Sequence, residues 1–443
     1  MRAHLLRRLF AGIATIMAMV AALELASASQ ESASGSNQVL EWNQIFVDTL
    51  VATNTPNSSS QRLGAIVHTA IFDAYNGVER RYTPIFVSNT APPGTSRRAA
   101  VIAAAYTALL SLFPSRQTEL DTSYAASIEA LGDDGGDGGK SRERGIAWGI
   151  EVASAVLAWR GADGFAGPYP AFRGGPEVGR WRPTPPAFAS MSAQGLAYTS
   201  PFVVVSNTQF QPGPPRPLDT TAYTDDFNAV KALGRITGST RTADQTALAP
   251  FWEGNASVHW NQAANQMARA RQLSVSDTNR LLAVLNIAMA DSAFTIWRAK
   301  RHYGDDLIPL TAVTWRPVTS IPLADTDGNP DTTPDPAWMP LVTTPAHPEY
   351  PAGHPAQNGA AATVLLSYFD DIQIFTLTTR LASGVDLPSR TYGSISQART
   401  DGNSARVWGG MHYPSTVAIS DQVGQAVANY VSENAMQPIR GQH

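Results

Sequence analysis

The sequence contains no cysteine, and only three of its 32 basic residues are lysines. The absence of cysteine excludes disulfides, thiolate nucleophiles, iron–sulfur clusters and cysteine-based zinc sites, so any metal or oxyanion must be held by nitrogen and oxygen atoms. Charged residues make up only 15%, the net charge is −4 and basic runs are lacking, which gives no indication of nucleic-acid binding. The 43% of apolar residues can form a sizeable core and argues against disorder.

The N-terminus carries the pattern of an export signal. Three arginines flank the start of an apolar run at residues 9–23, and the tripeptide at 26–28 matches a small-x-small cleavage site. The run is short for a bilayer span, and no later uninterrupted apolar run is long enough for one. We therefore expect a signal peptide at 1–28 and a secreted or periplasmic mature protein without a membrane span. An uncleaved membrane anchor is the alternative.

Helical periodicity dominates the rest of the chain, and no alternating strand pattern of useful length occurs. The clearest helical segments are residues 61–80, 97–112, 276–301, 355–369 and 411–431. Residues 163–222 are rich in proline, glycine and aromatic side chains, which indicates a long ordered connection that packs on the surface. The sequence predicts a helical N-terminal half at 29–222 and a helical C-terminal half at 223–443, which carries the candidate site.

The segment His347-Pro348-Glu349-Tyr350-Pro351-Ala352-Gly353-His354 directly precedes a helix of small residues. A helix N-terminus offers unpaired N–H groups and a partial positive charge to an anion. Gly353 would let that backbone approach the anion closely, and His354 would stand beside it for proton transfer. A plain helix start with a surface histidine is the alternative.

Arg406 and His412 flank the Gly409-Gly410 turn, which can direct both side chains toward one point. Arginine offers a planar donor fork to two oxygens, and a neutral imidazole can attack phosphorus or ligate vanadium. Lys300 and Arg316 add two cations upstream. The combination predicts a cage around a tetrahedral oxyanion such as phosphate or vanadate, whereas each residue alone could be a loop arginine or a capping histidine.

These residues resemble the signature of the vanadium-dependent haloperoxidase and type 2 phosphatidic acid phosphatase superfamily. That signature runs Lys, six residues, Arg-Pro; then Pro-Ser-Gly-His; then Ser-Arg, five residues, His, three residues, Asp. Similarity to bacterial haloperoxidase-like members extends over most of residues 40–430, for example at 65–70, 209–215 and 285–291. The resemblance implies an all-α fold with two packed helical bundles and the site in the core of one.

The resemblance also implies a role for each candidate residue. Three cations would bind the equatorial oxygens of vanadate or phosphate, namely Lys300, Arg316 and Arg406. Gly353 would donate its backbone N–H, and His354 would be the acid–base residue. His412 would be the vanadium ligand, or the nucleophile that becomes phosphohistidine in a phosphatase.

The chain departs from the signature at three residues, Ala352, Ala405 and Thr416, and in the fifteen residues that separate Lys300 from Arg316. Ala352 replaces a serine whose hydroxyl bonds the anion, a loss of about 1–3 kcal/mol of anion affinity. Thr416 stands where the aspartate that orients the histidine is expected, and a hydroxyl would orient it less strongly.

Three functions remain open at this point. The leading one is a vanadate-dependent haloperoxidase, which uses hydrogen peroxide to oxidise halide to a hypohalous species for a small organic acceptor. The second is a secreted acid phosphatase that acts through a phosphohistidine. The third is a catalytically impaired homologue, suggested by the departures from the signature. The oligomeric state is left open, a homo-oligomer included.

Overall fold

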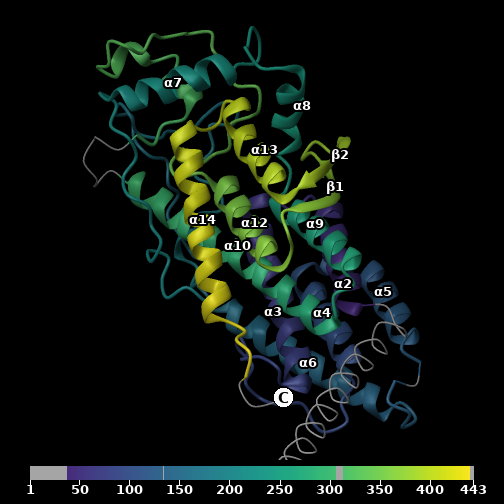
Figure 1. Cartoon of the computed structure of the whole chain (residues 1–443). Coiled ribbons are helices and arrows are strands. Elements are labelled where there is room, and N and C mark those ends of the chain that lie inside the picture. Colours follow the sequence, from purple (N-terminus) through teal and green to yellow (C-terminus); the bar gives the residue numbers. More distant parts are fainter. Residues whose placement is uncertain (1–36, 133, 306–312, 440–443) are drawn as a thin grey trace, which may run out of the picture.

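The computed structural model describes residues 37–132, 134–305 and 313–439, and helices dominate these ranges (Figure 1). The predicted signal peptide at 1–28 lies outside the described residues. The helices are α2 (Gln38–Ala52), α3 (Asn57–Glu79), α4 (Arg97–Leu112), α5 (Gln117–Glu129), α6 (Lys140–Gly161), α7 (Thr221–Leu233), α8 (Ala243–Phe251), α9 (Ala256–Ala270), α10 (Val275–Tyr303), α11 (Pro317–Ser320), α12 (Gly353–Tyr368), α13 (Ile395–Trp408) and α14 (Pro414–Asn434). Short 3-10 turns occur at η1 (Pro114–Arg116), η2 (Gln194–Tyr198) and η3 (Ala324–Thr326).

The prediction of an all-α fold is confirmed, with one small exception. Strands β1 (Ile372–Arg380) and β2 (Asp386–Ser394) form an antiparallel hairpin that the sequence analysis missed. In β1 the buried positions Phe375, Leu377 and Thr379 do alternate. The alternation was obscured because Ile372 and Ile374 are 80% and 81% exposed, so apolar residues occur on both faces.

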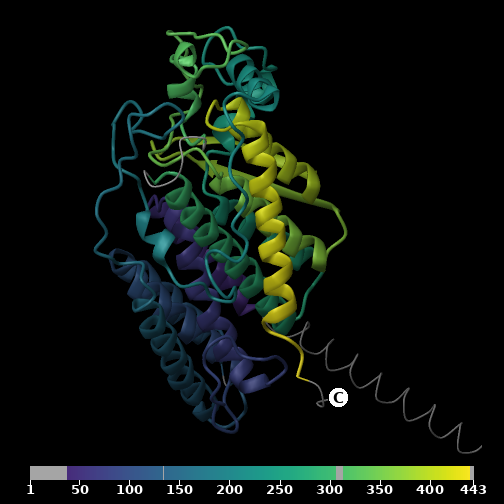
Figure 2. The same ribbon diagram turned by 90° about the vertical axis from the view of Figure 1, so that its left-hand side faces the viewer.

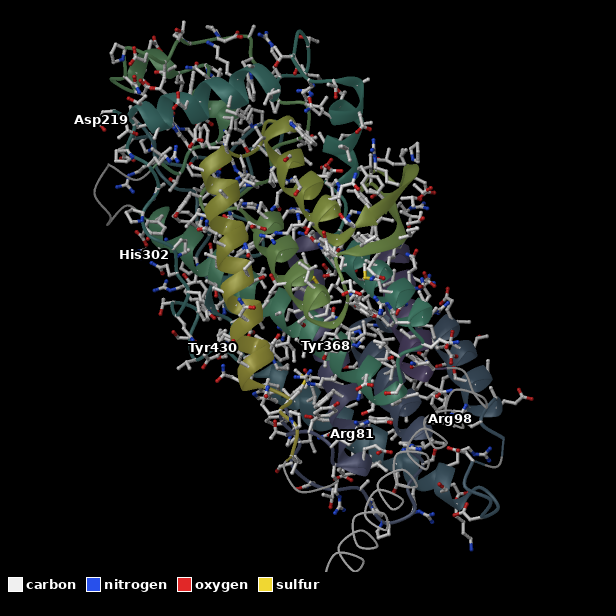
Figure 3. All side chains as sticks on the ribbon, viewed as in Figure 1. Arg81, Arg98, Asp219, His302, Tyr368 and Tyr430 are labelled. Atoms are coloured by element: carbon white, nitrogen blue, oxygen red, sulfur yellow. The ribbon has the colours of Figure 1, made fainter. Side chains whose placement is uncertain are left out.

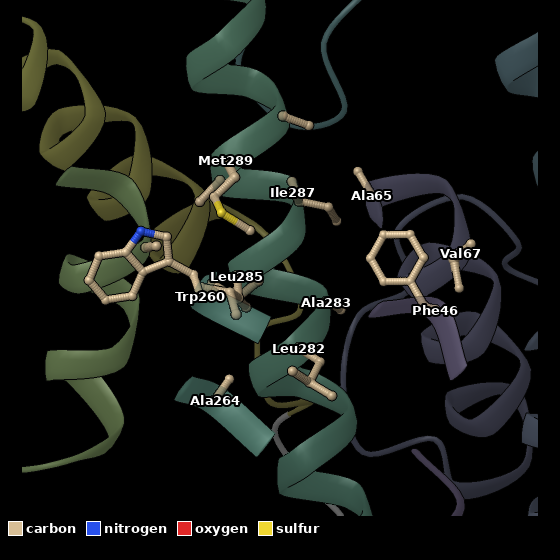
Figure 4. Packing of buried hydrophobic residues seen from close by; sticks show 14 of the residues in the cluster. Phe46, Ala65, Val67, Trp260, Ala264, Leu282, Ala283, Leu285, Ile287 and Met289 are labelled. Carbon is tan, nitrogen blue, oxygen red and sulfur yellow. The ribbon is translucent and has the colours of Figure 1, made fainter. Parts of the chain in front are cut away.

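Helix α10 forms the centre of the fold and is buried along almost its whole length. In Figure 4, Ala283 and Ile287 face Phe46 and the residues of α3, whereas the opposite side of α10 faces Trp260. A helix that is apolar on all sides is stable in water only when other elements surround it. Among the described residues α10 is the single helix long and apolar enough to cross a membrane by itself, and 94% of its apolar window is buried inside the protein.

Two groups of helices meet at α10. On one side α10 packs against α3, which contacts α4 and α6, and on the other side it packs against α12 and α14. Figure 2 shows α14, in yellow, apart from the blue helices α4 and α6. Helices α12 and α14 approach each other closely at Gly424. A Cβ placed on this residue would lie 1.9 Å from the carbonyl oxygen of Ala356. Glycine is therefore required there to position the start of α12.

The long connection between α6 and α7 is held against the helices by specific contacts. The buried carboxylate of Asp291 on α10 accepts the backbone N–H groups of Phe202, Val203 and Val204 at 2.7–3.0 Å. Tyr430 of α14, labelled in Figure 3, packs edge-on against Phe210 of the same connection. These contacts explain how a segment with little regular structure stays ordered.

Candidate active site

A cavity of about 200 Å³ lies where the start of α12, the end of α13 and the turn after α13 meet. Four of the six residues predicted to bind or act on the anion line it, namely Gly353, His354, Arg406 and His412. The remaining two, Lys300 and Arg316, are fully buried and lie behind this lining. Segments more than fifty residues apart in sequence therefore converge on one space.

Gly353 and His354, in the first turn of α12, line the cavity. The N-cap residue Ala352 supplies no side-chain cap, and its own N–H is bound by the hydroxyl of Ser420 at 2.8 Å. The first N–H groups of a helix have no acceptor within the helix, so those of Gly353 and His354 are candidate donors to an anion. A Cβ on Gly353 would lie 3.1 Å from the Trp297 ring, so this position favours glycine.

The hydrogen bond of His354 fixes which ring nitrogen carries the proton. Its Nε2 lies 3.2 Å from the carbonyl oxygen of Gly254, which can only accept, so Nε2 carries the proton and Nδ1 is bare. Burial, followed by the charge of Arg406, holds the pKa of His354 well below its ordinary value. At neutral pH this imidazole is therefore uncharged and able to take up a proton.

Arg406 lies in the last turn of α13, a helix that the sequence analysis did not predict. Its Nη1 donates to the carbonyl oxygen of Trp252 at 2.8 Å and its Nη2 to Sδ of Met411 at 3.0 Å, while its buried Nε has no partner among the described residues. Burial lowers the pKa of Arg406 to about 10, although Glu253, which also lines the cavity, opposes this shift. A buried cation with an unused donor is suited to an anionic ligand.

His412 is held from both sides of its ring. Nε2 lies 3.0 Å from Nη1 of Arg316, which can only donate, and Nδ1 lies 2.8 Å from Oε1 of Glu349. The proton therefore sits on Nδ1, and the lone pair is on Nε2. Burial and then the charges of Arg316 and Lys300 hold the pKa of His412 well below its ordinary value, so the imidazole is neutral.

Glu349 is the functional residue that sequence reasoning missed. Besides His412, its fully buried carboxylate accepts the N–H of Tyr413 at 3.1 Å and the hydroxyl of Thr416 at 3.0 Å. Thr416 thus bonds Glu349 and not His412, so Glu349 is the group that holds the imidazole. Burial raises the pKa of Glu349 to about 7, against the opposing effect of Arg316. The one signal in the sequence that could have indicated this role is the position of Glu349, an acidic residue within the segment 347–354.

Lys300 and Arg316 brace the segment that precedes α12. Nζ of Lys300 donates to the carbonyl oxygens of Pro348 and Glu349 at 2.6 and 3.2 Å. Arg316 donates from Nε to the carbonyl oxygen of His347 at 3.0 Å and from Nη2 to Nδ1 of the same residue at 2.8 Å. Direct contact of these two cations with an anion stays a prediction. The loop between them includes residues 306–312, which lie outside the described residues.

Comparisons with known proteins agree with this architecture. Residues 280–441, which include every candidate site residue, match the family model described as the VCPO second helical-bundle domain. The part of the chain that carries the candidate site is therefore similar to the vanadium haloperoxidase superfamily. No curated protein matches the chain in sequence.

Solved haloperoxidases share the fold over most of the chain. A bacterial vanadium-dependent iodoperoxidase is similar with a TM-score of 0.75 and 22% identity, over 91% of this chain and 98% of that one. A bacterial vanadium-dependent chloroperoxidase in its apo form gives a TM-score of 0.65 and 17% identity, over 85% and 93% of the two chains. Its holo form gives 0.60 and 16%, over 85% and 91%. At these identities the likeness establishes the fold.

Proposed function

We propose that the chain is a vanadate-dependent haloperoxidase. It would use hydrogen peroxide to oxidise halide to a hypohalous species, which then reacts with a small organic acceptor. The observation that carries the proposal is the shared cavity, which is lined by Gly353 and His354 at the start of α12, by Arg406 and by His412. Such donors together suit a tetrahedral oxyanion, and the solved relatives named above are haloperoxidases.

The residues of the cavity fit vanadate. Arg406 Nε and the N–H of Gly353 would hold its oxygens, and the lone pair on Nε2 of His412 would ligate the metal. Bound vanadate would supply Lewis-acid activation of hydrogen peroxide. Arg316 donates to the same Nε2 at 3.0 Å, so a ligand on this nitrogen would have to replace this hydrogen bond. Arg316 would then have a free donor beside the anion.

The two candidate reactions differ in what they require of His354. A bare Nδ1 on a neutral ring can accept a proton from hydrogen peroxide as the peroxide enters the cavity. A phosphatase needs the opposite, because His354 would have to donate a proton to the leaving group. Burial and the charge of Arg406 lower the pKa of His354, which opposes the charged form that this donation requires.

A secreted acid phosphatase remains the second candidate because of one observation. The bond from His412 to Glu349 supplies the carboxylate support that a nucleophilic histidine needs, even though Thr416 cannot supply it. In this reaction Nε2 of His412 would attack phosphorus. The two candidates thus share the cavity and differ in whether His354 takes up or delivers a proton.

The deciding experiment incubates the purified protein with vanadate, hydrogen peroxide and bromide, together with a diketone that reports bromination. We expect bromination by the wild type, none by His412→Ala, and unchanged activity of His302→Ala, which alters a histidine of α10 outside the cavity lining. Hydrolysis of nitrophenyl phosphate without bromination would establish the phosphatase instead. Absence of both activities would indicate an impaired homologue.

We also propose that the protein is exported, on the basis of the N-terminal pattern described above. Expression with a C-terminal tag followed by cell fractionation tests this proposal. A mature protein that begins near residue 29 outside the cytoplasm is the expected result. Retention of the whole chain in the membrane fraction would support the anchor alternative.

A further inference from the structure

We propose that Glu349 is the carboxylate that positions His412, in place of the aspartate that the superfamily signature carries four residues after this histidine. The inference deepens the proposed function and rests on His412 as the anion ligand. In this chain Thr416 occupies the signature position, and the carboxylate that contacts His412 belongs to Glu349, in the segment before α12. The carboxylate therefore reaches the histidine from another element.

The contacts of Glu349 direct its charge toward His412. Oε1 accepts from Nδ1 of His412 and from the N–H of Tyr413, while Oε2 accepts the hydroxyl of Thr416. No lysine or arginine forms an ion pair with this carboxylate among the described residues, because Lys300 binds the backbone oxygen of Glu349 instead. The imidazole is thus the one basic side chain in direct contact with the charge.

Opposite partners at the two ring nitrogens leave one protonation state for His412. Glu349 can only accept at Nδ1 when it is ionised, and Arg316 can only donate at Nε2. The lone pair is therefore held on Nε2, the nitrogen next to the cavity cations. A carboxylate on Nδ1 also makes Nε2 more basic, which strengthens its bond to a metal or to phosphorus.

Positions 349 and 416 lie so close together that the charge at one affects the charge that the other can carry. The hydroxyl of Thr416 lies 3.0 Å from Oε2 of Glu349, so a carboxylate at both positions would place two negative charges in contact in a buried region. One carboxylate with one neutral partner avoids this repulsion. The charge should therefore be transferable from one position to the other, but not duplicated.

The test compares Glu349→Gln, Thr416→Asp and the double variant by calorimetric titration with orthovanadate at pH 8. Loss of the carboxylate should weaken vanadate binding about 10–100-fold, the usual effect of removing a group that supports a metal ligand. Thr416→Asp alone should also weaken binding, because of repulsion. The double variant should bind more tightly than either single variant. Additive losses in the double variant would overturn the proposal.

A matched control separates positioning from stability. Asp226 accepts the N–H of Ser415 at 3.1 Å and also its hydroxyl, at the same end of α14, without contacting His412. Asp226→Asn should lower the melting temperature and leave vanadate affinity unchanged. If Glu349→Gln behaves like this control, Glu349 has only a structural role and the proposal fails.

A measurement on the wild type covers the case in which a variant does not fold. Nitrogen-15 NMR of the histidine rings at pH 8 should show the His412 proton on Nδ1, and a proton on Nε2 would overturn the proposal. Failure of the haloperoxidase function gives a different result. In that case the protein binds vanadate, with the affinities predicted for the variants at positions 349 and 416, and yet does not brominate. That result refutes the function and leaves the role of Glu349 unchanged.

Discussion

Replacement of Arg406 by methionine should separate anion binding from protein stability. Arg406 is 2% exposed and keeps one buried N–H without a partner among the described residues. A charge-assisted hydrogen bond to a bound oxyanion contributes about 1.5–3 kcal/mol, so its loss should weaken vanadate or phosphate binding about 10–150-fold. The charge of Arg406 also lowers the pKa of His412 and His354. Both values should therefore rise in the variant.

Without ligand, the same substitution should have little effect on stability or increase it. The shift of the Arg406 pKa from 12.5 to about 10 corresponds to roughly 3 kcal/mol by which the site disfavours the cation. Its removal recovers part of this cost and sacrifices the bond to the carbonyl oxygen of Trp252, worth about 1 kcal/mol. The two effects oppose each other, and the sum is near zero or favourable.

The assay pairs calorimetric titration of vanadate with urea unfolding of the protein without ligand. Arg406→Lys serves as the control, because it keeps the charge and loses the planar donor fork, so its affinity should fall between the other two. A methionine variant that binds vanadate as tightly as the wild type would refute the reasoning. So would a large loss of stability, which would mean that the arginine is mainly structural.

Three further predictions concern stability. Asp291→Ala leaves three N–H groups, two of them buried, without this acceptor and should lower the free energy of unfolding by about 3–5 kcal/mol. Asp370→Ala, at an exposed ion pair, should change it little; urea titration measures both. Gly424→Ala forces α14 away from the Ala356 carbonyl and should lower the free energy of unfolding by about 3 kcal/mol or more. It should also abolish vanadate binding, because α12 moves, and retained affinity would contradict this. Burial raises the pKa of Glu349 from 4.5 to about 7, so between these values the folded state holds a proton that the unfolded chain has lost. Unfolding free energy should therefore fall by about 3 kcal/mol from pH 4.5 to 7 relative to Glu349→Gln, and parallel pH profiles would exclude the shift.

The sequence by itself determined the helical class and identified four residues that line the cavity. Residues 276–301 and 355–369 carry apolar or small side chains at helical spacing, and helices α10 and α12 occupy these places. Spacing along a helix is a local property, so it can be read without knowledge of the fold. The motifs around Gly353 and Arg406 were recognisable for the same reason, because each is a short contiguous string.

Only the tertiary structure decided which groups meet. Glu349 and His412 are 63 residues apart, and nothing in either local pattern indicates that a carboxylate before α12 replaces one on α14. Lys300 and Arg316 look like anion ligands in the sequence, whereas the fold gives most of their donors to backbone oxygens and imidazoles. Local propensity is fixed by neighbours in the chain, but hydrogen-bond partners and burial depend on neighbours in space. The cavity itself is therefore a product of packing.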